Sequence, residues 1–198
     1  MTLSLKIVVL GPVAVGKTSL INYELKKESD LMTESTISSD YIKVTETVDF
    51  NNQKKEVELC IWDTAGNQTY IDCARFFIRG AHAVIFVFDI TSSQSFEELD
   101  NFFKIEETEL IPIKCLCGNK FDLQEQRQVT PVQALNKQNS NHLVSYYETS
   151  AKDGTNVQNL FESIIHEYLS KQPGDYDSDG TVQLNPTGTP PKKKSCCK

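Results

Sequence analysis

The sequence lacks the features that mark secreted, membrane-spanning and disulfide-bonded proteins. Its six cysteines do not follow the spacing of a small disulfide scaffold. No signal peptide precedes the first apolar run, and no apolar run reaches the length of a membrane span. We therefore expect a protein of a reducing, cytosolic compartment.

Basic charge is also scarce outside the last residues of the chain. The formal net charge is -7, and no basic patch occurs before Lys192. Nucleic-acid-binding proteins that work through overall charge carry a basic face. We therefore expect no nucleic-acid partner.

A tetrahedral metal site is equally short of ligands. Cys115 and Cys117 form a C-x-C pair in the run Ile113–Cys117, and two thiolates at this spacing could ligate a metal. No second cluster of cysteine or histidine is there to complete a tetrahedron. A buried strand is the favoured interpretation of this run.

Composition predicts one globular domain followed by a tail. The 198 residues are 39% hydrophobic and 24% charged, which is enough for one sizeable core and little for two. From Gln172 onward Pro, Gly, Asp, Ser and Thr dominate, and no apolar period remains. We expect a domain over residues 1–171 and a disordered tail over residues 172–198.

The clearest motif is the stretch Gly11–Thr18, with the sequence GPVAVGKT. It matches G-x-x-x-x-G-K-[ST] between an apolar run and a helical pattern, as a phosphate-binding loop does. Two glycines let backbone N–H groups converge on phosphate oxygens. Lys17 would reach the β- and γ-phosphates, and the Thr18 hydroxyl would ligate Mg²⁺. The motif predicts a nucleoside triphosphate site, and the alternative is an ordinary glycine-rich turn.

Hydrophobic periodicity predicts strands that alternate with helices. The expected strands are Leu5–Leu10, Tyr41–Phe50, Val57–Trp62, Ala83–Ile90, Ile111–Cys117 and Leu143–Tyr147. The expected helices are Lys17–Lys27, Ser95–Glu107, Pro131–Gln138 after an N-cap at Thr130, and Asn156–Leu169. Asn51-Asn52-Gln53 marks a hairpin turn, and Glu28–Asp40 is expected to be a loop. The pattern predicts an α/β fold with a doubly wound, six-stranded, mostly parallel sheet, one antiparallel strand and helices on both faces.

Three further loops fall at the carboxyl ends of expected strands, where such sheets bind their ligands. They are Asp63–Gly66 (DTAG), Gly118–Asp122 (GNKFD) and Glu148–Lys152 (ETSAK). An aspartate beside a phosphate loop can hold Mg²⁺ through a water, and Gly66 frees a backbone N–H for a γ-phosphate. Taken alone, D-x-x-G also fits an ordinary Asp-Gly turn. Independent turns have no reason to gather at one edge, so the loops indicate a single site.

The ordered set GPVAVGKT, Thr36 in a polar loop, WDTAG, NKFD and ETSAK resembles the small GTPases of the Ras superfamily over about residues 5–170. Within it, TISSDY, VELCIWDTAG, FFIRGAHAVIFVFDIT and a tail with two cysteines resemble the Rab branch. The resemblance implies a P-loop NTPase small G domain over residues 1–171 that binds GTP and GDP with Mg²⁺. It also implies a monomer that hydrolyses GTP and acts as a switch in vesicle traffic. An ATP-using P-loop kinase is disfavoured by NKFD and by the lack of a lid segment.

The resemblance assigns base recognition to the later loops. Asn119 and Asp122 would recognise guanine, because the carboxylate accepts two N–H bonds from a ring edge that adenine cannot offer. The Lys120 stem would lie along the base, and the Ala151 N–H would meet the exocyclic oxygen. The implied nucleotide contacts are Val13, Ala14, Val15, Gly16, Lys17, Thr18, Ser19, Thr36, Gly66, Asn119, Lys120, Asp122, Ser150, Ala151 and Lys152.

The resemblance assigns the switch to two loops. Thr36 would complete the Mg²⁺ ligands with Thr18 and Asp63, and with Gly66 it would sense the γ-phosphate. Loss of that phosphate would release both loops, an order-to-disorder transition. The implied catalytic residues are Lys17, Thr36, Gly66 and Asn67.

Three residues depart from the family pattern. Val13 stands where most members carry a small residue, and its branched side chain would crowd the attacking water and a catalytic arginine. Asn67 stands where the family usually has a longer, water-orienting glutamine, and Gln68 would need a one-residue shift to replace it. Ser29 stands where many relatives pack an aromatic against the base. We expect weak hydrolysis and fast nucleotide release, and the alternative is a GTP-binding recruiter whose hydrolysis is largely lost.

The resemblance implies protein partners at an aromatic surface. Tyr41, Trp62 and Phe77 match a triad through which Rabs meet effectors, and the alternative is that these rings are partly buried sheet residues. An exchange factor, an activating protein and a GDP-dissociation inhibitor are the other partners that the resemblance implies.

The tail ends in KKKSCCK. The C-a-a-X motif fails because its cysteine position holds Ser195. The dual-cysteine ending resembles that of Rabs and implies geranylgeranyl groups on Cys196 and Cys197, and the alternative is an unmodified polar tail. Two lipid chains with a basic cluster suffice for stable anchoring. We therefore expect the protein in the cytosol and on the cytoplasmic face of intracellular membranes.

Overall fold

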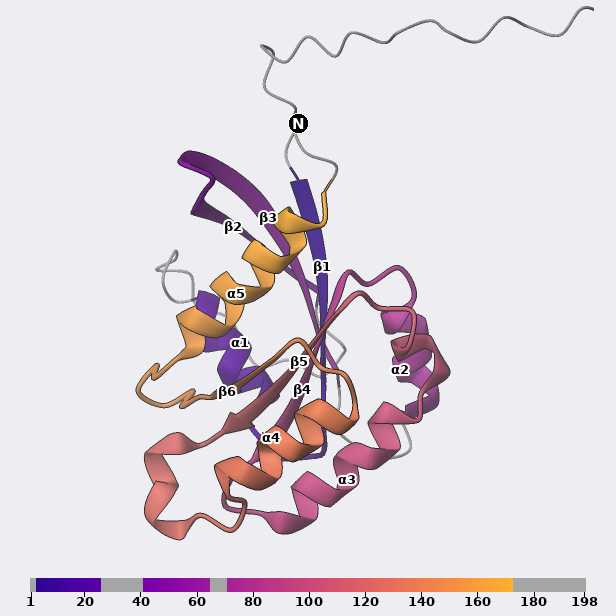
Figure 1. Ribbon diagram of the computed structural model, residues 1–198, viewed down its shortest axis with the longest axis vertical. Helices are drawn as coiled ribbons and strands as arrows, with labels where there is room; N and C mark the ends of the chain where they lie inside the picture. The colour runs from indigo at the N-terminus through magenta and orange to yellow at the C-terminus, as the bar shows by residue number, and fades with distance from the viewer. Residues whose placement is uncertain (1–2, 26–40, 65–70, 173–198) are drawn as a thin grey trace, which may run out of the picture.

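A six-stranded sheet runs through the part of the chain that the computed structural model describes, residues 3–25, 41–64 and 71–172 (Figure 1). The strands are β1 (Leu3–Leu10), β2 (Tyr41–Phe50), β3 (Gln53–Asp63), β4 (Ala83–Asp89), β5 (Ile113–Asn119) and β6 (Ser145–Glu148). Their order is β2-β3-β1-β4-β5-β6, and the β2–β3 pair is antiparallel while the other pairs are parallel. The predicted sheet is therefore confirmed.

Helices connect the strands and cover both faces of the sheet (Figure 1). The α-helices are α1 (Lys17–Leu25), α2 (Ile71–Ile78), α3 (Ser93–Phe103), α4 (Pro131–Ser140) and α5 (Val157–Ser170). Two short 3-10 helices, η2 (Glu106–Thr108) and η3 (Phe121–Gln126), lie in connections. Among the described helices, none is both long and apolar enough to cross a bilayer.

Side chains alternate along β1 and so divide the core between the two faces of the sheet. Leu5, Ile7 and Val9 belong to the cluster beneath α1 and α5, whereas Val8 and Leu10 belong to the cluster beneath α2, α3 and α4. All five side chains are fully buried. A strand buried on both faces needs a continuous apolar run, which is the pattern that the sequence has here.

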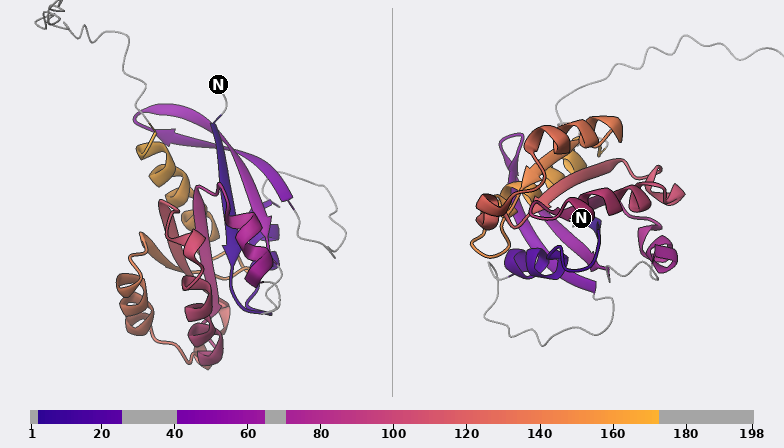
Figure 2. Two further views of the ribbon diagram at one scale, coloured as in Figure 1. Left: turned by 90° about the vertical axis from the view of Figure 1, so that its right-hand side faces the viewer. Right: turned by 90° about the horizontal axis from the view of Figure 1, so that it is seen from below.

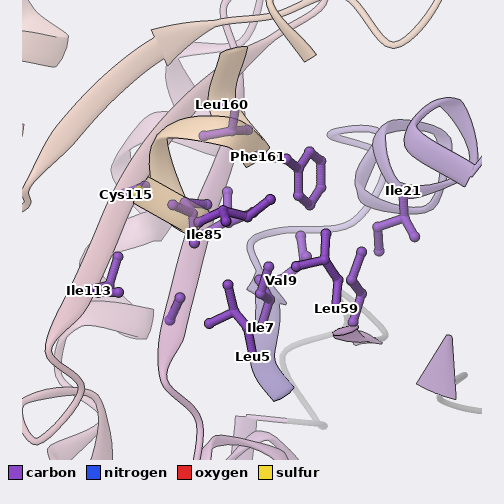
Figure 3. Packing of buried hydrophobic residues seen from close by; sticks show 14 of the residues in the cluster. Leu5, Ile7, Val9, Ile21, Leu59, Ile85, Ile113, Cys115, Leu160 and Phe161 are labelled. Carbon is purple, nitrogen blue, oxygen red and sulfur yellow. The ribbon is translucent and has the colours of Figure 1, made fainter. Parts of the chain in front are cut away.

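The α5 side of the core is shown in Figure 3. Leu160 and Phe161 of α5 and Ile21 of α1 extend toward the sheet, where Ile85 of β4 lies between Cys115 of β5 and Val9 of β1. Burial of each such side chain is worth about 2 kcal/mol relative to its exposure to water. This packing fixes α1 on the sheet and thereby fixes the loop that precedes it.

The hairpin between β2 and β3 turns on two residues, not on the three predicted. Asn51 and Asn52 have φ values of 51° and 61°, and Gln53 already pairs with Phe50. Asparagine tolerates the left-handed conformation that a two-residue hairpin turn requires. Figure 2 shows this long hairpin curving along one edge of the sheet.

The helices differ from the predictions in several places. The sequence pattern predicts no helix over Ile71–Ile78, where the structure has α2. Helix α3 begins early because the Ser92 side chain accepts a hydrogen bond from the Ser95 N–H, and its predicted last turn is the separate η2. The N-cap at Thr130 is confirmed, with a reciprocal hydrogen bond from its own N–H to Gln133. The predicted loop over residues 28–40 lies outside the described residues.

Candidate nucleotide-binding site

The loop between β1 and α1 depends on its two glycines. Gly11 has φ of 151°, and a Cβ there would lie 2.1 Å from the Val87 carbonyl oxygen of β4. Gly16 has φ of 93°, and a Cβ there would lie 2.4 Å from Nδ2 of Asn119. The loop therefore follows the ends of β4 and β5 at a distance that only glycine permits at these two positions.

The side chain of Lys17, the first residue of α1, lies within this loop. Its Nζ donates hydrogen bonds to the carbonyl oxygens of Gly11 at 2.8 Å and Pro12 at 2.7 Å, and only 6% of the residue is exposed. Burial lowers the pKa of Lys17 to about 8, although the charge of Asp63 acts in the opposite direction. An anion bound in the loop would stabilise the ammonium in the same sense as Asp63 does.

Two side-chain oxygens that could ligate a metal, one from α1 and one from β3, meet at the start of α1. The Thr18 hydroxyl donates a hydrogen bond of 2.5 Å to Oδ2 of Asp63, at the end of β3. The next residue, Thr64, donates to the Val9 carbonyl at 2.6 Å and ties the ends of β3 and β1 together. Mg²⁺ prefers oxygen ligands and takes few from the protein, so a hydroxyl and a carboxylate beside a phosphate loop fit this ion.

Asn119 joins three loops through one buried side chain. Its Nδ2 donates to the Val15 carbonyl of the phosphate loop at 2.9 Å. Its Oδ1 accepts hydrogen bonds from the Ala151 N–H and the Thr149 hydroxyl, both at 3.2 Å. The residue predicted to contact guanine therefore also organises the site, and one of its two N–H groups is used inside the protein.

Asp122 is oriented by the loop that follows β6. Ser150 is fully buried, and its hydroxyl donates to Oδ1 of Asp122 at 2.9 Å. The Lys152 ammonium lies 3.8 Å from Oδ2 of the same carboxylate. Ser150 and Lys152, which the resemblance implies only as nucleotide contacts, therefore also orient the Asp122 carboxylate.

Lys120 has a partner that sequence reasoning missed. Its Nζ lies 2.6 Å from Oδ2 of Asp89, whose Oδ1 accepts hydrogen bonds from the N–H and hydroxyl of Thr91. Burial alone would raise the pKa of Asp89, but the hydrogen bonds from Lys120 and Thr91 lower it below its usual value. The available signal was a single acidic residue near the end of the most hydrophobic strand, AVIFVFDI.

Some of the other predicted site residues lie within the described part of the chain, and some lie outside it. Val15 is buried, whereas Ala14 and Ser19 are exposed and Val13 is 62% exposed. Ala14 adopts the left-handed conformation, with φ of 63°. The positions outside the described residues are Ser29, Thr36, Gly66, Asn67, Cys196 and Cys197.

The three predicted surface aromatics form a continuous row. The ring centroids of Tyr41 and Trp62 are 5.1 Å apart, and those of Trp62 and Phe77 are 5.3 Å apart. Tyr41 is 45% exposed, and the other two rings are partly buried. Lys6 places its ammonium 5.3 Å from the Trp62 centroid. The row runs from β2 across β3 to α2.

Cys115 and Cys117 lie in a buried strand, as predicted. Both belong to β5, and burial raises the pKa of Cys115 to about 11 and that of Cys117 to about 12. Within the described ranges, no group of three or more His, Cys, Asp or Glu side chains is placed to hold a metal. These thiols therefore serve as small core side chains.

The loops at this edge of the sheet are those of a P-loop nucleotide-binding domain. The family model described as "Ras family" matches residues 6–170. GTP-binding protein ypt4 of Schizosaccharomyces pombe is 34% identical over 84% of this chain and 72% of its own length. Ras-related protein Rab-5A of Dictyostelium discoideum is 37% identical over 97% and 94%, and Rab-7a of the same organism is 32% identical over 98% and 96%.

The chain therefore belongs to the Ras family and is a Rab-like small GTPase within it. It is a GTP-binding switch of vesicle trafficking, and its reaction is the hydrolysis of GTP.

Proposed function

We propose that this Rab-like GTPase binds GTP and GDP across the loops that Asn119 joins, and that it recruits partners to a membrane surface mainly in its GTP form. The observation that carries the proposal is the hydrogen bonding of one buried amide to Val15 and Ala151. Because this side chain holds the phosphate loop beside the loops expected to recognise the base, one nucleotide could contact all of them. The other observations below refine this proposal.

The phosphates are assigned to the first loop. The backbone N–H groups from Val13 to Ser19 and the ammonium of Lys17 would hold them, since a helix N-terminus and a Gly-rich turn attract anions. The carbonyls of Gly11 and Pro12, which now accept from Lys17, keep its side chain directed along the loop. A short movement of Nζ would exchange these neutral acceptors for phosphate oxygens.

Guanine is assigned to the loops after β5 and β6. The Asp122 carboxylate, held by Ser150, would accept the two N–H groups of the guanine edge. An adenine would offer this carboxylate neither of the two N–H groups and would still displace water from it, which is a penalty in a partly buried site. The Lys120 stem would lie along the base while Asp89 holds its ammonium.

Mg²⁺ is assigned to Thr18, Asp63 and Thr36. The hydroxyl and the carboxylate that meet beside α1 fit the ion, and Thr36 lies outside the described residues. When bound, the ion would supply positive charge that offsets the negative charge of the phosphates during hydrolysis. Thr18 and Asp63 would then act as ligands, directly or through water, in place of their mutual hydrogen bond.

Weak intrinsic hydrolysis follows from two side chains. Val13 exposes 62% of its surface on the phosphate loop, where its methyl groups would meet a water or an activating arginine approaching the γ-phosphate. Asn67, outside the described residues, would have to orient that water with a side chain one methylene shorter than glutamine. The second candidate function is a GTP-binding recruiter that has largely lost hydrolysis, and the exposed Val13 is the observation in its favour.

Nucleotide exchange and membrane attachment complete the proposal. Ser29 offers no aromatic ring to the base, so nucleotide release should be fast. Geranylgeranyl groups on Cys196 and Cys197, with Lys192–Lys194 beside them, would anchor the protein to an anionic membrane. The Tyr41–Trp62–Phe77 row would meet effectors, because rigid aromatic rings are common anchors at protein interfaces.

Calorimetry with Mg²⁺ present tests the proposed site. We expect GTP and GDP to bind and ATP to bind far more weakly, and equal affinity for guanosine and adenosine nucleotides would overturn the assignment. Single-turnover hydrolysis of bound GTP then separates the two candidates. A slow rate that an activating protein raises supports the switch, whereas no turnover with or without an activator supports the recruiter.

A further inference from the structure

A bidentate ion pair lies directly behind the base-recognition loops. Arg127 follows η3, the 3-10 helix that contains Asp122, and Glu148 ends β6 just before Thr149. The two terminal guanidinium nitrogens donate to the two carboxylate oxygens at 2.6 and 2.7 Å. The side chains are 19% and 15% exposed, so the pair is largely withdrawn from water.

Each member of the pair is held by further contacts. The Tyr146 hydroxyl donates to Oε1 of Glu148 at 2.6 Å. The Arg127 guanidinium donates to the Val129 carbonyl at 3.0 Å and lies 6.0 Å from the centroid of the Phe121 ring. A bidentate guanidinium–carboxylate pair has a fixed planar geometry. These contacts therefore fix the segment after η3, which carries Arg127, relative to the end of β6, which carries Glu148.

The ion pair is connected to the groups that face the base by very short paths. Phe121, which the guanidinium contacts, precedes Asp122, and its N–H donates to the Thr149 carbonyl at 2.9 Å. Glu148 is two residues from Ser150, whose hydroxyl holds Asp122. Three interactions therefore join the two loops: Ser150 with Asp122, the Phe121 N–H with the Thr149 carbonyl, and Arg127 with Glu148. The charged pair is the one farthest from the expected base.

We propose that Arg127 and Glu148 are positioning residues for guanine recognition, which hold the Asp122 loop against the Ala151 loop. The inference rests on the proposed guanine site. Two N–H groups of one purine edge can both reach the Asp122 carboxylate only if the loop that carries it keeps its place relative to the loop after β6. The pair supplies that constraint without contacting the nucleotide.

A purely stabilising role makes a different prediction. Buried ion pairs are weak evidence for stability, because desolvation offsets most of their attraction. Loss of stability alone would weaken the binding of every nucleotide by the same factor. Loss of loop position would instead lower the affinity most for nucleotides that make both hydrogen bonds to Asp122. The discriminating quantity is therefore the affinity ratio of two bases, not the affinity for one.

The test uses the full chain with Mg²⁺ and compares GDP with inosine diphosphate, which lacks the exocyclic amine and one of the two donors. The variants are Glu148→Gln, Arg127→Met and their combination. We expect each single variant to release fluorescent GDP about tenfold faster, and the double variant to be little worse than either single, because partners in contact are not additive. The GDP preference over inosine diphosphate should shrink in all three, and Arg127→Lys should restore it in part.

The matched control is the ion pair of Glu167 and Lys171, 2.7 Å apart at the end of α5. Glu167→Gln and Lys171→Met should leave release rate and base preference unchanged. Thermal melting with saturating GDP shows that each variant is folded. An unchanged GDP preference in folded Glu148→Gln and Arg127→Met would overturn the inference.

The remaining outcomes are also decisive. If the wild-type chain does not prefer GDP to inosine diphosphate, the proposed guanine site fails, and the inference fails with it. If the charge variants do not fold, Tyr146→Phe removes one hydrogen bond to Glu148 and keeps the pair intact. A smaller loss of GDP preference in Tyr146→Phe is expected, and a wild-type preference there would overturn the inference.

Discussion

Asn119 of β5 and Val15 of the phosphate loop are 104 positions apart in the chain and are joined by a hydrogen bond of 2.9 Å from the amide of Asn119 to the carbonyl of Val15. The Oδ1 atom of the same Asn119 side chain accepts a hydrogen bond from the Ala151 N–H. One side chain therefore determines the distance between the part of the site that holds phosphates and the part that holds a base.

Asn119→Ala should lower the free energy of unfolding by about 3 kcal/mol, because it leaves buried groups of two loops without partners. The variant should show no nucleotide binding at concentrations that saturate the wild-type protein. Chemical denaturation and calorimetry measure the two effects. Asn159→Ala, which removes an exposed amide from α5, is the control and should do neither. Wild-type nucleotide affinity in Asn119→Ala would contradict the organising role.

Gly11→Ala should destabilise the fold by about 3 kcal/mol or more, since the new methyl would overlap the Val87 carbonyl oxygen of β4. Gly80→Ala is the matched control, because Gly80 also has positive φ but has no atom within 4 Å of the added Cβ. It should cost only about 1 kcal/mol, the backbone penalty alone. Equal losses in the two variants would show that the contact with β4 is not limiting.

Val13→Gly combined with Asn67→Gln should accelerate single-turnover GTP hydrolysis by about tenfold, because the first change opens the outer side of the loop and the second restores the longer amide. Each single variant should give part of the increase. Val132→Gly, at an exposed position on α4, controls for loss of a valine elsewhere. A double variant as slow as the parent would remove these two residues as the cause of weak hydrolysis.

His82 should make the folded protein sensitive to mild acid. Its Nδ1 accepts a hydrogen bond from the Lys6 N–H at 2.9 Å, and its ring meets Tyr168. Burial lowers the pKa of His82 below 6.5, and the charge of Lys6 lowers it further. The unfolded chain therefore binds this proton first, so stability is full above about pH 6.5 and falls as the pH drops below it.

Denaturation curves at several pH values check the His82 prediction. His82→Asn keeps an acceptor near the Lys6 N–H and removes the titrating ring, so its stability should change less between pH 7 and pH 5. A slope unchanged by His82→Asn would assign the acid sensitivity to other groups.

Cys115 and Cys117 should resist alkylation in the folded protein. Burial raises the pKa of their thiols to about 11 and about 12, so almost none is thiolate at pH 8. Peptide mapping after iodoacetamide should find both unmodified until denaturant is added. Rapid labelling of either residue in the native protein would mean that β5 opens more readily than its burial indicates.

The sequence predicts the strands well because β1, β4 and β5 are short, largely apolar runs and because polar and apolar residues alternate in β2 and in the second half of β3. It predicts the site because the loops follow strands whose ends must meet. It does not predict α2, since eight residues are shorter than the window of about 11 to 18 residues over which an apolar period is recognised, although the apolar positions of IDCARFFI do recur at helical spacing. It also misses Asp89 as the partner of Lys120 and Glu148 as the partner of Arg127. These pairs are made by the order of strands in the sheet, which no local pattern of residues contains.

β1 presents successive side chains to opposite halves of the interior, and its continuation is the turn that would grip phosphate. A slip of this strand by one position would carry every side chain to the opposite half and disrupt the packing of both halves at once, so no other register of the strand packs as well. A bound anion that pulled on the turn would therefore pull on β1, which cannot shift without disrupting the packing on both faces of the sheet. Movement during the switch must then come from segments that are not anchored in this way.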